Sequence, residues 1–346
     1  MSFLVIDGSQ GEGGGQVLRT ALTLSILTKT PIELVNIRAN RNRPGLLRQH
    51  LTSVKAAQEI SSAKTEGVEL GAKRIRFSPG DVKPGNYHFV IGTAGSTVLV
   101  CQTILPVLML ADASSIVTFE GGTHNGMSPS LCFLEHSYLP VLKMMGVECK
   151  INVNKLGFYP AGGGKWQLTV APVSSLKRVH LLEAREPTHL LNGRCKMKAI
   201  VSLLSETIGE REISTARKIL GWDHAEEVIK NVATPGPGNS FQLSIEGDFH
   251  ASVFEVVGEL GVSAERVAKR CAGRVKKFIE AQAAVEEHLA DQLLIPMVLA
   301  GGGSFTTVKP SLHTKTNIEV IKLFLNLKIK SEQENKQGWK ITVGSE

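Results

Sequence analysis

The chain has 346 residues, of which 42% are hydrophobic and 21% charged, and this is enough for one large or two ordinary domains with a substantial core. No apolar run approaches the ~18 residues of a membrane span, and residues 1–7 lack the basic segment of a signal peptide, so we expect a cytoplasmic protein without a membrane partner. The net charge of +7 favours a polyanionic partner, whereas the aromatic content of 5% argues against extensive base stacking.

The first predicted strand, residues 1–7, leads into a glycine-rich turn at residues 8–15 and then into an apolar helical pattern. Glycines allow close backbone approach and positive φ, so a strand, turn and helix in this order can cradle a phosphate. The turn is neither a Walker A loop nor a dinucleotide fingerprint, and a flexible loop is the alternative. Glu12 could bind a metal ion, while Gln16 and Arg19 share one helical face and could reach the same anion.

An arginine-rich loop follows the next predicted strand, residues 32–38, and precedes a helix that extends through Ile60. Guanidinium groups match the geometry of phosphate oxygens, and this density of arginines is unusual for an ordinary solvated surface. We therefore interpret the loop as a phosphate-binding segment. Its arginines are Arg38, Arg41, Arg43 and Arg48.

A second unit begins with strands predicted near residues 74–77 and 87–90, followed by an apolar helix that carries Gln102. A glutamine in apolar surroundings needs a partner, either an internal hydrogen bond or a ligand. The unit continues with a strand, a polar loop, a helix and a strand, at residues 116–119, 120–129, through 145, and 148–153.

The order of strand, polar loop and helix occurs three times, near residues 32–60, 116–153 and 305–330. Such repetition indicates one large domain built from similar units. The pattern is interrupted between the second and third units by a stretch with its own strands and helices. We therefore expect a large domain of residues 1–181 and 280–346, with a small α/β domain of residues 182–279 inserted into it.

The third unit contains the segment Lys309 to Asn317, in which Pro310 disfavours a helix before it and Ser311 can act as an N-cap. This predicts that His313 lies at or just inside a helix N-terminus. The helix dipole and free backbone N–H groups favour a phosphate there, and they keep the imidazole neutral and nucleophilic. A surface or capping histidine is the alternative.

These stretches together resemble the RNA 3′-terminal phosphate cyclase family over nearly the whole chain. The resemblance implies an α/β (α+β) fold of three βαβαββ-like repeats, with the small α/β domain inserted before the third repeat. The matching motifs lie at residues 12–19, 37–51, 121–123, 158–164, 289–293 and 312–317.

The resemblance also implies an activity, the ATP-dependent conversion of an RNA 3′-terminal phosphate into a 2′,3′-cyclic phosphodiester. His313 would attack the α-phosphorus of ATP, form a covalent histidine–AMP and release pyrophosphate. AMP would then pass to the RNA 3′-phosphate as an RNA-(3′)pp(5′)A anhydride, and the vicinal 2′-hydroxyl would close the ring and expel AMP. Each displacement thereby acquires a better leaving group.

Further site residues follow from the same motif matches. Glu12 would bind the divalent ion, Mg or Mn, and His288 stands where some members carry a tyrosine that stacks on adenine. Contacts to triphosphate or RNA phosphate would come from Arg19, Arg38, Arg41 and Gln49, beside the Gln16 noted above. The nucleotide pocket would be lined by Gln102, Pro129, Asp291 and Gln292.

Two other interpretations were weighed. One is a catalytically silent relative that binds RNA or protein in ribosome assembly, but such relatives lack the motif histidine, so His313, Glu12 and the arginines favour the enzyme. The other is an enolpyruvyl transferase, which shares a repeated-unit architecture, although likeness of fold is weak evidence for function and the histidine motif has no part in that chemistry. The number of chains in the assembly stays open, with a homodimer among the alternatives.

Overall fold

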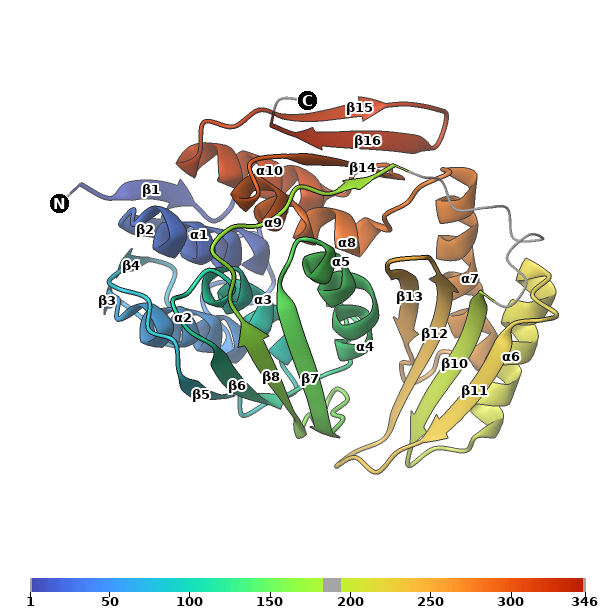
Figure 1. Cartoon of the computed structure of the whole chain (residues 1–346). Helices are drawn as coiled ribbons and strands as arrows, with labels where there is room; N and C mark the ends of the chain where they lie inside the picture. Colours follow the sequence, from blue (N-terminus) through green and yellow to red (C-terminus); the bar gives the residue numbers. More distant parts are fainter. Residues whose placement is uncertain (1, 183–193, 345–346) are drawn as a thin grey trace.

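The computed structural model describes residues 2–182 and 194–344. Within these ranges the strands form four sheets of four strands each, and the helices pack against them (Figure 1). The chain is therefore mixed α/β, as predicted. In the same ranges, no helix combines the length and the apolar character that crossing a membrane requires.

The first sheet is built from residues 4–78 in the order β1-β2-β4-β3. Strands β1 and β2 are parallel, while β4 is antiparallel to both of its neighbours, β2 and β3. Helix α1 follows β1, and helix α2 follows β2. The bounds are β1 (Leu4–Asp7), α1 (Gly15–Thr28), β2 (Ile32–Val35), α2 (Arg48–Ser61), β3 (Lys64–Glu66) and β4 (Ile75–Ser78).

The second sheet repeats this arrangement with the order β5-β6-β8-β7. Its first two strands are parallel and the other pairs are antiparallel. The second helical segment is broken by a π-helix, η1, between α4 and α5. The bounds are β5 (Asn86–Val90), α3 (Thr97–Leu108), β6 (Ser115–Gly121), α4 (Leu131–Phe133), η1 (Leu134–Tyr138), α5 (Leu139–Met144), β7 (Glu148–Lys155) and β8 (Gly164–Ala171).

The third sheet has the corresponding order, with β9 parallel to β14, followed by β16 and β15. Its first strand, β9, comes before the segment that interrupts the repetition. The interruption therefore lies inside the third unit, after one short strand, and not before the unit as expected. The bounds are β9 (His180–Leu181), α8 (Glu287–Gln292), α9 (Leu294–Leu299), β14 (Gly303–Val308), α10 (Leu312–Phe324), β15 (Ile329–Gln333) and β16 (Gly338–Val343).

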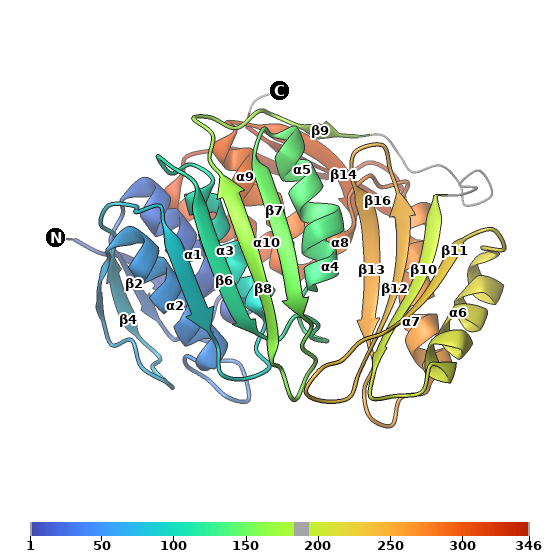
Figure 2. The same ribbon diagram turned by 60° about the horizontal axis from the view of Figure 1, so that its bottom comes forward.

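The fourth sheet lies in the interrupting segment, at one end of the molecule (Figure 2). Strand β10 is parallel to β11 and antiparallel to β12, which in turn pairs with β13. Helices α6 and α7 pack against each other and against this sheet. The bounds are β10 (Cys195–Ser202), α6 (Thr207–Leu220), β11 (Glu226–Asn231), β12 (Gly238–Glu246), β13 (Ala251–Val257) and α7 (Ala264–Glu280).

The buried apolar side chains form two main cores. One extends from Ile6 to Leu181 and resumes from Ala284 to Val343. The other contains residues from Cys195 to Ala283, including the buried Trp222. The division into a large domain and an inserted domain, with boundaries near 182 and 279, stays a prediction, and the separation of the two cores supports it.

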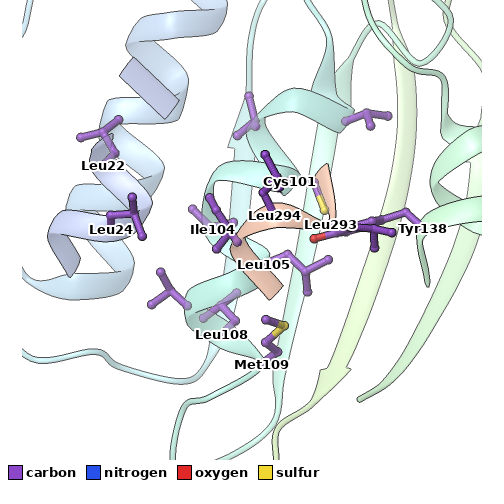
Figure 3. Packing of buried hydrophobic residues seen from close by; sticks show 14 of the residues in the cluster. Leu22, Leu24, Cys101, Ile104, Leu105, Leu108, Met109, Tyr138, Leu293 and Leu294 are labelled. Atoms are coloured by element: carbon purple, nitrogen blue, oxygen red, sulfur yellow. The ribbon is translucent and has the colours of Figure 1, made fainter. Parts of the chain in front are cut away.

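Helix α1 lies deep in the larger core because nearly every one of its residues from Val17 to Ile26 is buried. Figure 3 shows Leu22 and Leu24 of this helix facing the side chains of α3, with Leu293 and Leu294 nearby. Burial of each such leucine contributes about 1.5–3 kcal/mol. This packing holds the N-terminal end of α1 in place, and that end carries Gln16 and Arg19.

Candidate active site

A cavity of about 750 Å³ opens between the helices of the larger core and the β13–α7 face of the fourth sheet. Residues that are far apart in the sequence meet in its wall, because α1, α3, α8 and α10 each contribute side chains. The predicted site residues that line it are Gln16, Arg19, Gln102, Pro129, His288, Asp291, Gln292 and His313.

His313 lies in the first turn of α10, as the sequence predicted. The side chain of Ser311 caps this helix by accepting a hydrogen bond from the Thr314 N–H at 3.1 Å. Burial of the ring, and then the charges of Arg19 and Arg41, lower the pKa of His313. The imidazole is therefore neutral near pH 7, which is the form with a free lone pair.

Arg19 supplies the buried positive charge of the cavity. Its side chain is 9% exposed, and its Nη2 donates a hydrogen bond to the Gln16 Oε1 at 2.6 Å. Burial lowers the pKa of Arg19 to about 10, and Asp291 opposes this shift. The guanidinium consequently stays protonated at neutral pH and can bind an anionic group.

Asp291 is buried in the same wall, and its Oδ1 has no hydrogen-bond partner among the described residues. Burial raises the pKa of Asp291 to about 7, although Arg19 acts in the opposite direction. A buried polar atom without a partner costs free energy, so this oxygen favours a ligand that can donate a hydrogen bond to it.

Polar contacts connect α1, α8 and α10 behind these side chains. Asn317 donates a hydrogen bond to the Asp291 carbonyl oxygen at 2.9 Å and accepts one from Thr20. Gln102 of α3 donates a hydrogen bond to Gln292 of α8. The internal hydrogen bond that the sequence left open for Gln102 is therefore present, and the side chain also reaches the cavity.

His288 lies in the cavity wall beside Phe133, with the two rings edge to face and their centroids 6.5 Å apart. Burial of the ring lowers the pKa of His288, and Arg274 and His313 lower it further, whereas Glu287 and Glu255 act in the opposite direction. A neutral, partly buried imidazole can stack on a planar base.

The remaining predicted residues, Glu12, Arg38, Arg41 and Gln49, do not line this cavity. Arg38 is buried, and its Nη1 donates hydrogen bonds to the carbonyl oxygens of Arg43 and Gly45 at 2.6 and 2.9 Å. Gln49 accepts a hydrogen bond from the Ser96 N–H at 2.8 Å. Both side chains thus shape neighbouring loops.

Glu12 lies against α10, because its backbone N–H donates a hydrogen bond to Thr316 Oγ1 at 2.9 Å. Gly11 next to it has a φ of +59°, and a Cβ there would collide with the Thr316 side chain. This close approach requires glycine. The glycine-rich turn is thereby held beside the helix that carries His313.

The carboxylate of Glu12 forms an ion pair with Arg41 through one oxygen, while its Oε2 is buried without a hydrogen-bond partner in the described chain. No group of three or more metal-ligating side chains occurs among residues 2–182 and 194–344. Magnesium is commonly bound by one or two carboxylates together with substrate phosphates. The free oxygen of Glu12 fits that mode of binding.

Comparison with known proteins was informative over most of the chain. The family model for RNA 3′-terminal phosphate cyclase matches residues 10–331. The chain belongs to the RNA 3′-terminal phosphate cyclase family. Proteins named RNA 3′-terminal phosphate cyclase from Koribacter versatilis and Ectopseudomonas mendocina are 46% and 45% identical, each over 97% of this chain, and cover 94% and 96% of their own lengths. The protein of that name from Salmonella typhimurium is 43% identical over 95% of this chain and 96% of its own.

One wall of the cavity in this member of the cyclase family escaped the sequence analysis. Strand β13 contributes Glu255 to it, and α7 contributes a set of basic side chains. The α7 residues recur at helical spacing, a signal that was present but was read only as a helix. The basic residues are Lys269, Arg270, Arg274 and Lys277.

Proposed function

We propose that this chain is an ATP-dependent RNA 3′-terminal phosphate cyclase that works through a covalent histidine–AMP. The observation that carries the proposal is the position of His313, in the first turn of α10 and in one cavity with Arg19. Its lowered pKa supports a nucleophilic role. Membership of the cyclase family supports the overall reaction.

In the first step, the neutral imidazole of His313 attacks the α-phosphorus of ATP. A phosphorus–nitrogen bond forms, the bond between the α- and β-phosphates breaks, and pyrophosphate leaves. The protonated Arg19 stabilises the negative charge that accumulates on the phosphate oxygens. Gln16 orients this guanidinium through their 2.6 Å hydrogen bond.

In the second step, an oxygen of the RNA 3′-phosphate attacks the phosphorus of the histidine–AMP. The phosphorus–nitrogen bond breaks, His313 is regenerated, and RNA-(3′)pp(5′)A is formed. In the third step, the vicinal 2′-hydroxyl attacks the RNA phosphorus, loses its proton and expels AMP. The products are the 2′,3′-cyclic phosphodiester, AMP and pyrophosphate, so every phosphate is accounted for.

The rest of the proposed site holds the nucleotide. The residues that support this role are those of the α3–α8 wall, Gln102, Asp291 and Gln292, together with Pro129 and His288. Glu12 would bind a divalent cation, Mg or Mn, which when bound neutralises phosphate charge. Arg41, Arg38 and Gln49 support the phosphate-side loops next to Glu12.

Incubation with α-labelled ATP and a divalent ion tests the covalent step. We expect label on the denatured native protein and none on His313→Ala. The control is His136→Ala, which removes an exposed histidine that does not line the cavity and should retain the label. Equal labelling of native protein and His313→Ala would exclude His313 as the nucleophile.

A second assay tests the acceptor. RNA with a 3′-terminal phosphate should become resistant to phosphatase when incubated with native protein and ATP, because a cyclic diester has no monoester to hydrolyse. A labelled protein that never alters the RNA end would contradict the cyclase proposal while leaving the covalent step intact. An unlabelled protein that binds RNA would favour a non-catalytic role in RNA binding.

A further inference from the structure

Helix α7 has two chemically different faces. Val267, Cys271, Val275 and Phe278 are buried in the core beneath the fourth sheet. The opposite face turns toward the cavity and presents the basic residues Lys269, Arg270, Arg274 and Lys277, with Gly273 between them. The amphipathic pattern explains why the helix forms, but it does not explain why its outer face is so uniformly basic.

These cations lack the partners that surface lysines and arginines often have. Lys269, Arg270 and Lys277 form no ion pair with any residue of the described chain. Arg274 donates one hydrogen bond, to the Glu255 carbonyl oxygen at 2.8 Å. On another side of α7, by contrast, Glu265 pairs with Arg211 at 2.8 Å. Like charges at helical spacing repel one another, and an anionic ligand in the cavity would remove that repulsion.

The carboxylates on the same wall do not neutralise this face. The Glu255 carboxylate accepts hydrogen bonds from Ser240 and Gln242, and its Oε1 lies 3.8 Å from the buried His124. Glu259 follows β13 and is exposed. The basic face therefore keeps a net positive charge toward the cavity.

The geometry suits an extended polyanion. From Lys269 to Lys277 the helix rises by about 12 Å, at 1.5 Å per residue, whereas Arg19 and His313 lie on helices of the opposite wall. A triphosphate held at Arg19 leaves the α7 face free. An RNA chain whose 3′-phosphate reaches His313 carries one further negative charge for each nucleotide that leads away from it.

We propose that the α7 face formed by Lys269, Arg270, Arg274 and Lys277 binds the phosphodiester backbone of the RNA substrate on the 5′ side of its terminal phosphate. The inference rests on the proposed function and adds a subsite to it. Contacts to phosphates do not read sequence, so the subsite selects a single-stranded polynucleotide end over a mononucleotide and tolerates any base.

The test compares substrates of increasing length with a charge-neutralising double variant, Lys269→Gln with Lys277→Gln. The substrates are uridine 3′-phosphate and a decanucleotide with a 3′-phosphate. We expect the KM for the decanucleotide to rise about tenfold, while the KM for the mononucleotide and labelling by α-labelled ATP without RNA stay as in native protein. The log–log salt dependence of decanucleotide binding should weaken by about 1.4, since each lost phosphate contact on a single strand removes about 0.7.

The matched control is Lys276→Gln. Lys276 is exposed on the same helix, next to Lys277, but it does not line the cavity. It should leave the KM for the decanucleotide unchanged. An equal loss in the Lys276 variant would overturn the proposal in favour of a general charge effect.

Two further outcomes would also overturn it. An equal rise in KM for the mononucleotide, or impaired labelling without RNA, would assign the α7 cations to the reacting phosphates. Direct binding of the decanucleotide, measured by fluorescence anisotropy, separates this inference from the proposed function. If native protein never labels or cyclises, but the double variant binds the decanucleotide more weakly, the cyclase proposal fails and the RNA subsite stands.

Discussion

At the scale of single residues, the cavity keeps a neutral base and a charged guanidinium close together. Burial acts on both, but Arg19 begins from so high a pKa that it stays protonated at about 10. His313 begins near neutrality and loses its proton. The same environment therefore produces a nucleophile and an anion-binding group, and this can be tested through pH.

The rate of protein labelling by α-labelled ATP should be insensitive to pH over a range where an ordinary histidine titrates. With a pKa of 6.5, an unperturbed imidazole is roughly three-quarters protonated at pH 6. Because the pKa of His313 is lowered, we expect the rate at saturating ATP to fall by less than about twofold between pH 8 and pH 6.

Asp291 is the group that could obscure this result, because burial raises its pKa to about 7. The control is therefore Asp291→Asn, in which any inflection near pH 7 should vanish. An inflection at or above pH 6.5 that persists in this variant would show that His313 has no lowered pKa.

Glu212 predicts a pH dependence of stability in the opposite sense from most carboxylates. It is fully buried in α6, where Asn239 donates a hydrogen bond to Oε2 at 3.1 Å and Oε1 has no partner in the described chain. Burial raises the pKa of Glu212 from 4.5 to about 7. The folded chain therefore holds this proton more tightly, and stability falls as pH rises from about 4.5 to about 7.

The size of this effect is roughly 3 kcal/mol, at 1.36 kcal/mol for each unit of pKa. We expect Glu212→Gln to be nearly as stable as native protein at pH 5 and more stable at pH 8, in urea unfolding followed by Trp222 fluorescence. Glu210→Gln, at an exposed position of the same helix, should leave the pH dependence unchanged. Parallel curves for native protein and Glu212→Gln would refute the assignment.

At the scale of elements, the position of His313 depends on how α10 begins. Removal of an N-cap hydroxyl costs about 1 kcal/mol, and Ser311 accepts its hydrogen bond within two residues of His313. We expect Ser311→Ala to lower both the unfolding free energy and the rate of labelling by ATP, because the first turn frays and the imidazole loses its fixed orientation.

Helix α7 offers the matched variant, since Ser263 caps it in the same way by accepting from the Arg266 N–H at 3.3 Å. Ser263→Ala should cost similar stability without slowing the labelling. If the two variants slow it equally, the cap of α10 has no special role in positioning His313.

Elements whose local patterns and caps were clear could be predicted from the sequence. Pro310, Ser311 and the apolar spacing after them located the start of α10, and the structure begins the helix at Leu312. Strand β9 was missed because it has two residues and owes its existence to pairing with β14. Local patterns cannot indicate so non-local a partner.

The candidate site shows the same limit. Sequence motifs indicated the residues of α1, α3, α8 and α10 that meet in the cavity, yet not that Arg38 turns to the carbonyl oxygens of Arg43 and Gly45. A guanidinium suits a phosphate or a carbonyl equally well in sequence. Only the folded loop, in which Arg38 has a φ of +54°, distinguishes the two.

At the scale of the whole molecule, the cavity joins two hydrophobic cores that are separate in sequence. Side chains from both surround it, so a ligand inside it contacts both. Each core contains a buried tryptophan, Trp166 in the larger one and Trp222 in the other. Single-tryptophan variants can therefore report on each core.

ATP should stabilise both cores together. The background is His313→Ala, which prevents covalent labelling, and a ligand at 100 times its Kd adds about 2.7 kcal/mol to the unfolding free energy. We expect that increase in Trp166→Phe with Trp339→Phe, where Trp222 reports, and also in Trp222→Phe with Trp339→Phe, where Trp166 reports. A shift seen by Trp166 alone would mean that the nucleotide contacts only the larger core. The β13–α7 wall would then be free for the RNA backbone, and a decanucleotide should raise the stability that Trp222 reports.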